Sequence, residues 1–185
     1  AGDGTATALT SGGTAPYEYI WSNGVQPQIL GTGISSTIDP LQSGQYFCTV
    51  VDSNDCPSVS ANTVTVNEPD SVFGTSGTTD VSCNLGNDGS ATVFPSGGVG
   101  NYSYSWSPSG GSNPTAASYT DLSAGTYSCV ITDANNCPFV VTNIVVSEPT
   151  AVFGTFITDS VSCNGWQDGS ATVFPSGGVG NYSYS

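Results

Sequence analysis

Six cysteines are the residues best able to do chemistry in this chain of 185 residues. They recur with similar spacing, and one set consists of Cys83, Cys129 and Cys137. No C-x-x-C pair occurs and the chain has no histidine, so zinc binding is not expected. In an oxidising environment the expected fate of such cysteines is a disulfide bond. The disulfide candidates are Cys56, Cys83, Cys137 and Cys163, while Cys48 and Cys129 are candidates for a buried thiol or an alternative disulfide.

The pairing of these cysteines is open between three arrangements. If Cys83 and Cys137 lie at opposite ends of a β-sandwich, about 25 Å apart, each of them reaches only a neighbouring repeat. A different chain path would join Cys83 to Cys137 within one repeat. The third arrangement joins Cys83 to Cys129 across the core.

Carboxylates are the second group with possible chemistry. Asp52, Asp55 and Asp133 lie in turns rich in Asp and Asn, whose oxygens are the ligands that calcium prefers. Calcium takes about six to eight oxygens, and these turns offer too few side chains and no D-x-D-x-D-G loop. The favoured interpretation is an Asx turn that closes a hairpin, so no cofactor is expected and calcium is the alternative.

Enzymatic activity is not expected, because the chain has no Lys, Arg or His and a net charge of −14. The usual general base, the Schiff-base lysine and the phosphate-binding arginine are therefore missing. The carboxylates fall singly in turns, unlike the paired carboxylates of a glycosidase. The lack of cations also excludes nucleic acid as a partner. Membrane insertion is not expected, because no apolar run approaches the roughly 20 residues of a membrane span.

The cysteines and turn carboxylates recur along the chain because its sequence contains an internal repeat. Residues 81–105 and 161–185 differ at three of 25 positions and are offset by 80. The first part of the chain fits the same frame with four extra residues, which predicts a longer loop around 26–34. The predicted domains are a repeat lacking its first strand (1–69), a complete repeat (70–149) and a partial repeat of first strands only (150–185). Glu-Pro dipeptides mark the joints between them.

Alternation of apolar and polar residues predicts the elements within each repeat. Three aromatic residues alternate with serines at 102–106, and turn signals separate such segments about every 8–12 residues. This pattern predicts an all-β fold of tandem Ig-like β-sandwich repeats of about 80 residues in an elongated array. Residues 122–129 resemble the tyrosine-corner segment of such sandwiches. Trp166 occupies a turn position and is expected to be exposed. The predicted core aromatic residues are Trp21, Trp106, Tyr102, Tyr104 and Tyr127.

The landmarks follow the order VSCNxxxDGSATV, YSYSWS, LSAGTYSCVITDANNC and EP. This order is similar to the repeats of the SprB family, the large Bacteroidetes gliding-motility adhesins. The resemblance implies an extracellular filament attached to the outer membrane, exported by type IX secretion. It also implies neighbouring repeats of the same chain and the gliding and secretion machinery as partners. Ser71 and Ser160 lie in Asp-Ser-Val sequences that resemble an O-glycosylation signal used by Bacteroidetes.

Two functions follow as hypotheses. The leading one is a structural stalk segment of a secreted cell-surface adhesin that projects a distal adhesive tip. The alternative is that each repeat binds surface polysaccharide, which would need an exposed aromatic platform or a groove.

Overall fold

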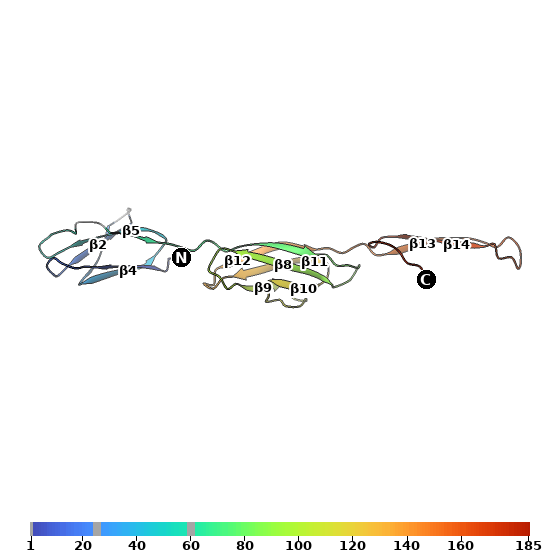
Figure 1. Cartoon of the computed structure of the whole chain (residues 1–185), viewed down its shortest axis with the longest axis horizontal. Coiled ribbons are helices and arrows are strands. Elements are labelled where there is room, and N and C mark those ends of the chain that lie inside the picture. The colour runs from blue at the N-terminus through green and yellow to red at the C-terminus, as the bar shows by residue number, and fades with distance from the viewer. Residues whose placement is uncertain (1, 24–26, 59–61) are drawn as a thin grey trace. The chain divides into compact units, whose positions relative to one another are not determined.

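The chain folds as strands joined by turns. The computed structural model describes residues 2–23, 27–58 and 62–185. Over these residues it contains no helix, which confirms the predicted all-β class, and so no helix that could cross a membrane. The chain divides into two compact units, residues 1–69 and residues 70–185 (Figure 1).

Residues 70–149 form two three-stranded antiparallel sheets that enclose one core. One sheet has the order β10-β8-β7 and the other β12-β11-β9. In chain order this is the A-B-E and C-F-G arrangement of an Ig-like sandwich, as the sequence predicts. The strands are β7 (Phe73–Thr79), β8 (Gly89–Ser96), β9 (Ser103–Ser107), β10 (Ser118–Leu122), β11 (Gly125–Thr132) and β12 (Pro138–Val146).

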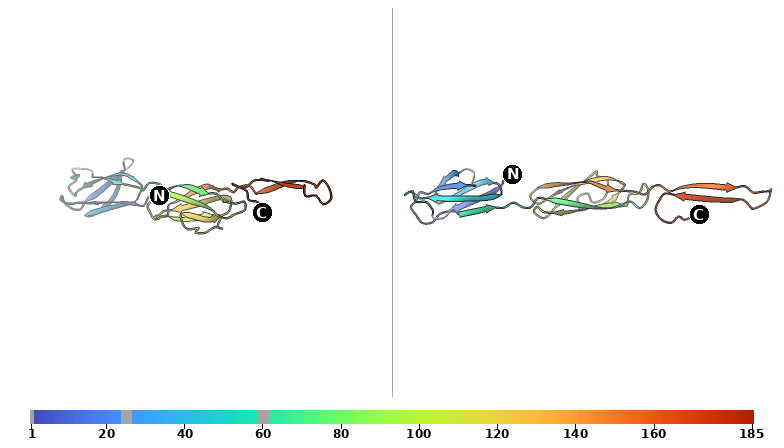
Figure 2. Two further views of the ribbon diagram at one scale, coloured as in Figure 1. Left: turned by 45° about the vertical axis from the view of Figure 1, so that its right-hand side comes forward. Right: turned by 90° about the horizontal axis from the view of Figure 1, so that it is seen from above.

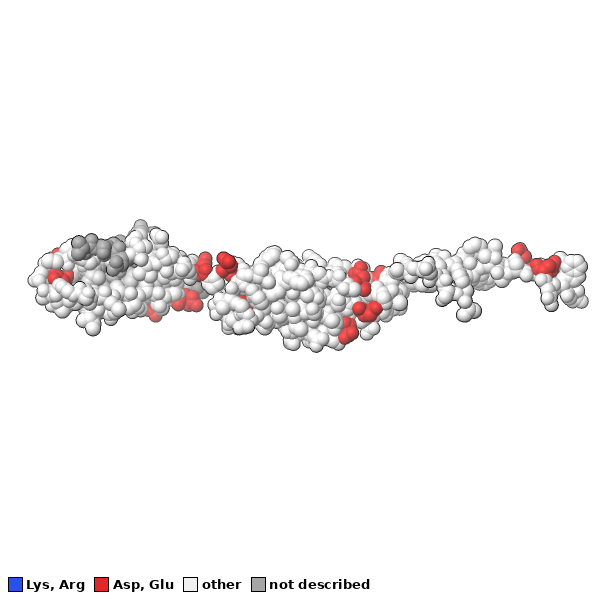
Figure 3. Space-filling view, viewed as in Figure 1, with Lys and Arg blue, Asp and Glu red and all other residues white. Residues whose placement is uncertain are grey.

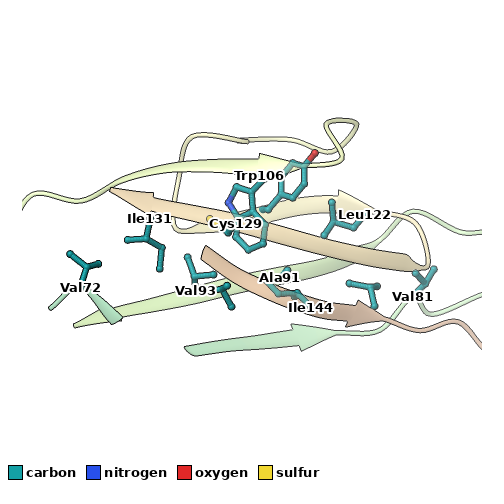
Figure 4. Close-up of a cluster of buried hydrophobic side chains, with 12 residues drawn as sticks. Val72, Val81, Ala91, Val93, Trp106, Leu122, Cys129, Ile131 and Ile144 are labelled. Atoms are coloured by element: carbon teal, nitrogen blue, oxygen red, sulfur yellow. The ribbon is translucent and has the colours of Figure 1, made fainter. Parts of the chain in front are cut away.

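Alternating side chains from both sheets build this core (Figure 4). In β8, Ala91 and Val93 are buried while the residues between and beside them face outward. Trp106 from β9 lies between the sheets, and its indole N–H donates to the Ala116 carbonyl at 2.9 Å. A buried aromatic side chain covers about 150–250 Å², which stabilises the fold by roughly 4–6 kcal/mol before entropy is counted.

A tyrosine corner is present, as residues 122–129 predict. The Tyr127 hydroxyl donates to the Ser123 carbonyl four residues upstream at 2.9 Å, and Cys129 follows two residues later. The same bond recurs in the first unit, where Tyr46 donates to the Gln42 carbonyl at 3.0 Å. This bond is a hallmark of Ig-like sandwiches and fixes the strand that carries the buried cysteine.

Residues 1–69 form a two-stranded sheet β1-β4 and a four-stranded sheet β3-β2-β5-β6. Among the described residues β1 pairs with β4 alone, so no counterpart of β7 lies beside it. Strand β3 lies where the sequence predicts a longer loop, because β2 offers a free edge to the returning chain. Gln26, at the start of that predicted loop, lies outside the described residues. The strands are β1 (Gly4–Leu9), β2 (Glu18–Ser22), β3 (Pro27–Thr32), β4 (Ser35–Leu41), β5 (Gly44–Val51) and β6 (Asn62–Val66).

Residues 150–185 contribute a hairpin of β13 (Phe153–Asp159) and β14 (Ser170–Ser176) (Figure 2). Its register equals that of β7 and β8, since Phe153 faces Ser176 as Phe73 faces Ser96. The division into one complete and two incomplete repeats stays a prediction.

Candidate functional site: the linker clamps

The turn after β11 is built around the Asp133 carboxylate, which is 5% exposed. Its Oδ1 accepts the N–H groups of Asn135 and Cys137 at 2.9 and 2.8 Å. Its Oδ2 accepts the N–H of Val99 at 2.9 Å and so joins this turn to the loop after β8. The Val99 N–H, followed by that of Cys137, lowers the pKa of Asp133, because these bonds favour the charged form.

In the first unit, the Asp52 carboxylate holds the turn after β5 in the same way. Its oxygens accept N–H groups from Asn54 at 2.9 Å, Cys56 at 3.0 Å and Thr14 at 3.1 Å. The N–H of Cys56, followed by that of Thr14, lowers the pKa of Asp52. Asp52 and Asp133, two of the three calcium candidates, therefore act as backbone clamps. The third, Asp55, is exposed with a left-handed backbone at φ 59°. Within the described ranges, no group of three or more His, Cys, Asp or Glu could hold a metal ion.

The linkers that enter residues 70–149 and 150–185 are each held by two consecutive glycines after the second strand. Gly98 N–H donates to the Asp70 carbonyl at 2.7 Å, and Gly178 N–H donates to the Thr150 carbonyl at 2.8 Å. Gly97 has a left-handed φ of 71°, and a Cβ there would overlap the Ser71 carbonyl. Only glycine fits this position, because a side chain would push the linker away. We call this contact the incoming clamp.

A tyrosine hydroxyl supports the glycine turn in each copy of the repeat. Tyr102 donates to the Gly97 carbonyl, and the two equivalent bonds have lengths of 2.6 and 2.7 Å. The double glycine and the tyrosine therefore form one unit that recurs along the chain. The equivalent pairs are Tyr17 with Gly12 and Tyr182 with Gly177.

The linker that leaves residues 70–149 is held by the turn between β7 and β8. Ser147 N–H donates to Asp80 Oδ1 at 2.8 Å, and the Glu148 carboxylate accepts the Leu85 N–H at 2.5 Å. The Asn84 amide donates to the Pro149 carbonyl at 3.2 Å. We call these bonds the outgoing clamp. Together with Gly178, they hold four consecutive linker residues, 147–150, by hydrogen bonds.

The turn that carries the outgoing clamp is itself fixed by Asp88. Its Oδ1 accepts the Ser82 N–H at 3.0 Å, and the Ser82 side chain, followed by this N–H, lowers the pKa of Asp88. Asp168 repeats this arrangement with Ser162 at 3.0 Å. Trp166 is 61% exposed, as predicted, without altering the turn.

All six cysteines are free thiols in this structure, and Cys48 and Cys129 are buried. Burial raises the pKa of Cys129 to about 11 and also raises the pKa of Cys48. Cys83 lies beside the outgoing linker and Cys137 directly before β12. A strand of nine residues spans about 26 Å, far beyond the roughly 7 Å that a disulfide allows between Cα atoms. This separation argues against a Cys83–Cys137 bond within one repeat. Pairing of Cys83 with a neighbouring repeat and pairing of Cys83 with Cys129 both stay predictions, as they do for the equivalent Cys163.

The structure places the predicted core aromatic residues in two settings. Trp21 and Trp106 are buried. The three predicted tyrosines are half-buried and pack against the core. Tyr119 was missed in the sequence, although it alternates with polar neighbours in β10. It is fully buried, stacks on Trp106 at 5.3 Å and donates its hydroxyl hydrogen to the Pro108 carbonyl. The half-buried tyrosines are Tyr102, Tyr104 and Tyr127.

Ser71 and Ser160, the O-glycosylation candidates, are both exposed. Ser71 belongs to the linker that the incoming clamp holds. Modification of either serine stays a prediction.

Comparisons with known proteins give a family match and a likeness to solved structures. A family model for the SprB repeat matches residues 1–26, 75–111 and 155–185, together about half of the chain. The solved "Structure of amphioxus IgVJ-C2 molecule" is 12% identical, and the alignment covers 79% of this chain and 97% of that one. Its TM-score of 0.36 is too low to support an argument. No curated protein matches the chain.

Proposed function

Because the chain belongs to the SprB repeat family, which is associated with cell-surface proteins, we propose that it is a stalk segment of a secreted adhesin. SprB repeats and Ig-like folds are structural domains and generally not enzymes. In this proposal each repeat is a spacer in an elongated filament, and the adhesive tip lies elsewhere. Export by type IX secretion and transport by the gliding machinery are part of the proposal through the resemblance of the repeats.

The observation that supports the stalk most is the way the linker is held. A flexible linker leaves consecutive domains free to fold back, whereas a stalk must transmit force and keep its length. Residues 147–150 are hydrogen-bonded one after another, by the outgoing clamp on one side and Gly178 on the other. Pro149 adds stiffness, since its ring restricts the backbone. In an array of repeats, stability is approximately the sum of the stability of each repeat and the interactions between adjacent repeats. The bonds that hold the linker between two repeats therefore set the stiffness of the array.

The charge distribution supports the same proposal. The face in Figure 3 shows carboxylates in separate groups and leaves the broad middle of residues 70–149 uncharged. With no Lys, Arg or His anywhere, neighbouring filaments have no opposite charge with which to associate. Their repulsion acts only near contact, because screening at physiological salt limits it to about 8 Å.

An experiment on the bacterium that encodes the chain tests the stalk. Removal of the codons for one 80-residue period is expected to shorten a surface filament, seen by immunogold electron microscopy, while adhesion is retained. The stalk proposal would be wrong if the filament kept its length, or if antibody to this segment labelled no surface structure.

A second measurement tests the clamp on the purified chain. The pair Gly97→Ala and Asn84→Ala removes one contact at each end of residues 70–149. We expect faster amide hydrogen exchange at Gly98 and Leu85, the two clamp donors, with the core amides of β11 unchanged. Unchanged exchange at both donors would mean that the clamps do not hold the linkers in solution.

A further inference from the structure

A cavity of about 510 Å³ opens in residues 1–69, within the roughly 300–1,000 Å³ typical of ligand pockets. It lies between the start of β2, the end of β3 and the turn that follows β5. From the sequence, only Asp52 and Asp55 in this place were assigned a role, as calcium candidates or Asx-turn residues, and no ligand pocket was expected here. The lining residues that matter most are Tyr17, Glu18, Thr32, Val51, Asp52 and Asp55.

The pairing of the strands explains the floor of the cavity. Glu18 is paired with Thr32 of β3 on one side and with Val51 of β5 on the other. Tyr19 and Trp21 are buried, so Glu18 projects from the opposite, outer face of the sheet. Thr32, Glu18 and Val51 therefore form a row across the outer face of the sheet. The row includes Thr32 only because β3 extends the sheet beyond β2.

The equivalent place in residues 70–149 is different. Glu18 and Asp55 correspond to Ser103 and Asn136 in the repeat frame, and β9 is the edge of its sheet. The Ser103 hydroxyl donates to the Thr132 carbonyl at 3.3 Å and is thus already engaged. Three departures from the repeat pattern therefore meet at one place: the extra strand and two additional carboxylates. A spacer has no need of these changes, whereas a binding site does.

The chemistry of the lining selects the ligand. Glu18 and Asp55 have exposed carboxylates with no hydrogen-bond partner among the described residues, so they can accept hydrogen bonds from a ligand. Asp52 is less able to do so, because its oxygens already accept three backbone N–H groups that hold the turn. The Tyr17 hydroxyl donates to the Gly12 carbonyl at 2.7 Å, which fixes the ring beside the cavity. An aromatic ring beside free acceptors suits a molecule with an apolar face and many hydroxyl groups.

We propose that this cavity binds a sugar residue of a polysaccharide, with Glu18 and Asp55 accepting hydrogen bonds from its hydroxyl or ammonium groups. An anionic sugar is disfavoured, because the chain has no cation to pair with it. The first repeat therefore combines the spacer fold with a contact to a glycan, and the site is specific to this repeat.

Titration of the reduced 185-residue chain tests the proposal. The probes are a neutral gluco-oligosaccharide and the matching glucosamine oligosaccharide, followed by backbone amide NMR. We expect saturable shifts confined to residues 17–18, 31–32 and 51–55. A preference for the glucosamine probe would assign an ammonium contact, and equal binding would assign hydroxyl contacts. Both results support the proposal.

Variants taken from the equivalent repeat positions sharpen the test. Glu18→Ser and Asp55→Asn each introduce the residue that the next repeat carries, so folding is expected to be retained. Each is expected to weaken binding at least about tenfold, since a charged acceptor is lost. The control Ser103→Ala is expected to leave the affinity unchanged.

Several outcomes would overturn the sugar site: no saturable binding of either probe, shifts elsewhere in the chain, or unchanged affinity of both variants. Calcium binding at this cavity in the absence of sugar would overturn it too. None of these results bears on the stalk, whose support lies in the linker clamps.

Discussion

Residues 81–105 and 161–185 have nearly the same sequence in two different surroundings. Both form the same hairpin with the same register, and both close it with the same Asp-to-Ser turn. Burial differs completely. Val93 is 1% exposed and its equivalent Val173 is 46% exposed, while Val81 and Val161 are 3% and 51% exposed. The hairpin is therefore encoded locally, and its apolar face becomes a core only where β9–β12 cover it.

The largest expected effect is a charge placed at the two equivalent valines. Val93→Asp buries an unpaired carboxylate and should lower the free energy of unfolding of residues 70–149 by about 4 kcal/mol. Val173→Asp stays in contact with water and should change it by less than about 0.5 kcal/mol. Urea denaturation followed by near-UV circular dichroism measures both. Equal losses would show that the hairpin packs on a core of its own.

A smaller effect is expected for Asp133, whose bond to Val99 has no described counterpart at the exposed Val179. The pKa of Asp133 is lowered in the folded state, so its charge stabilises the fold above the unfolded pKa of about 3.9. This contribution is lost as the pH falls through the lower, folded pKa. Asp133→Asn should therefore be less stable than the wild-type chain at pH 7, and the difference should shrink in acid.

Thermal unfolding at a series of pH values measures that difference. Relief of repulsion among the other carboxylates acts on both proteins and cancels in the comparison. A difference that stayed constant from neutral pH to acid would mean that the carboxylate charge does not support the turn.

The smallest difference is expected between Cys83 and Cys163, which are exposed in the same turn of the two hairpins. In the reduced native chain they should react with iodoacetamide at similar rates. Cys129 should react far more slowly, because burial raises its pKa to about 11 and blocks access. Peptide mass spectrometry over time measures all three. Rapid labelling of Cys129 would contradict the closed core.

Local patterns predicted much of the fold. Alternation at 102–106 placed Trp106 inward, and the segment ending at Cys129 predicted the tyrosine corner. Tyr119 escaped notice because its short strand carries only one aromatic residue among polar ones. The clamps were not predicted either. The bond from the Gly98 N–H to the Asp70 carbonyl joins two backbone groups, so the residue types in the sequence do not reveal it.

Composition and repetition alone determined that this chain has no cationic chemistry, that it forms short strands, and that it belongs among repeat proteins. Those conclusions need only residue types and their spacing along the chain. Tertiary structure decided which copy of the shared hairpin sequence has a buried face. It also decided which aspartates accept hydrogen bonds from backbone N–H groups, and where a cavity opens beside Glu18. Each of these depends on strands brought together from distant parts of the chain, and burial and hydrogen bonding are properties of that assembly.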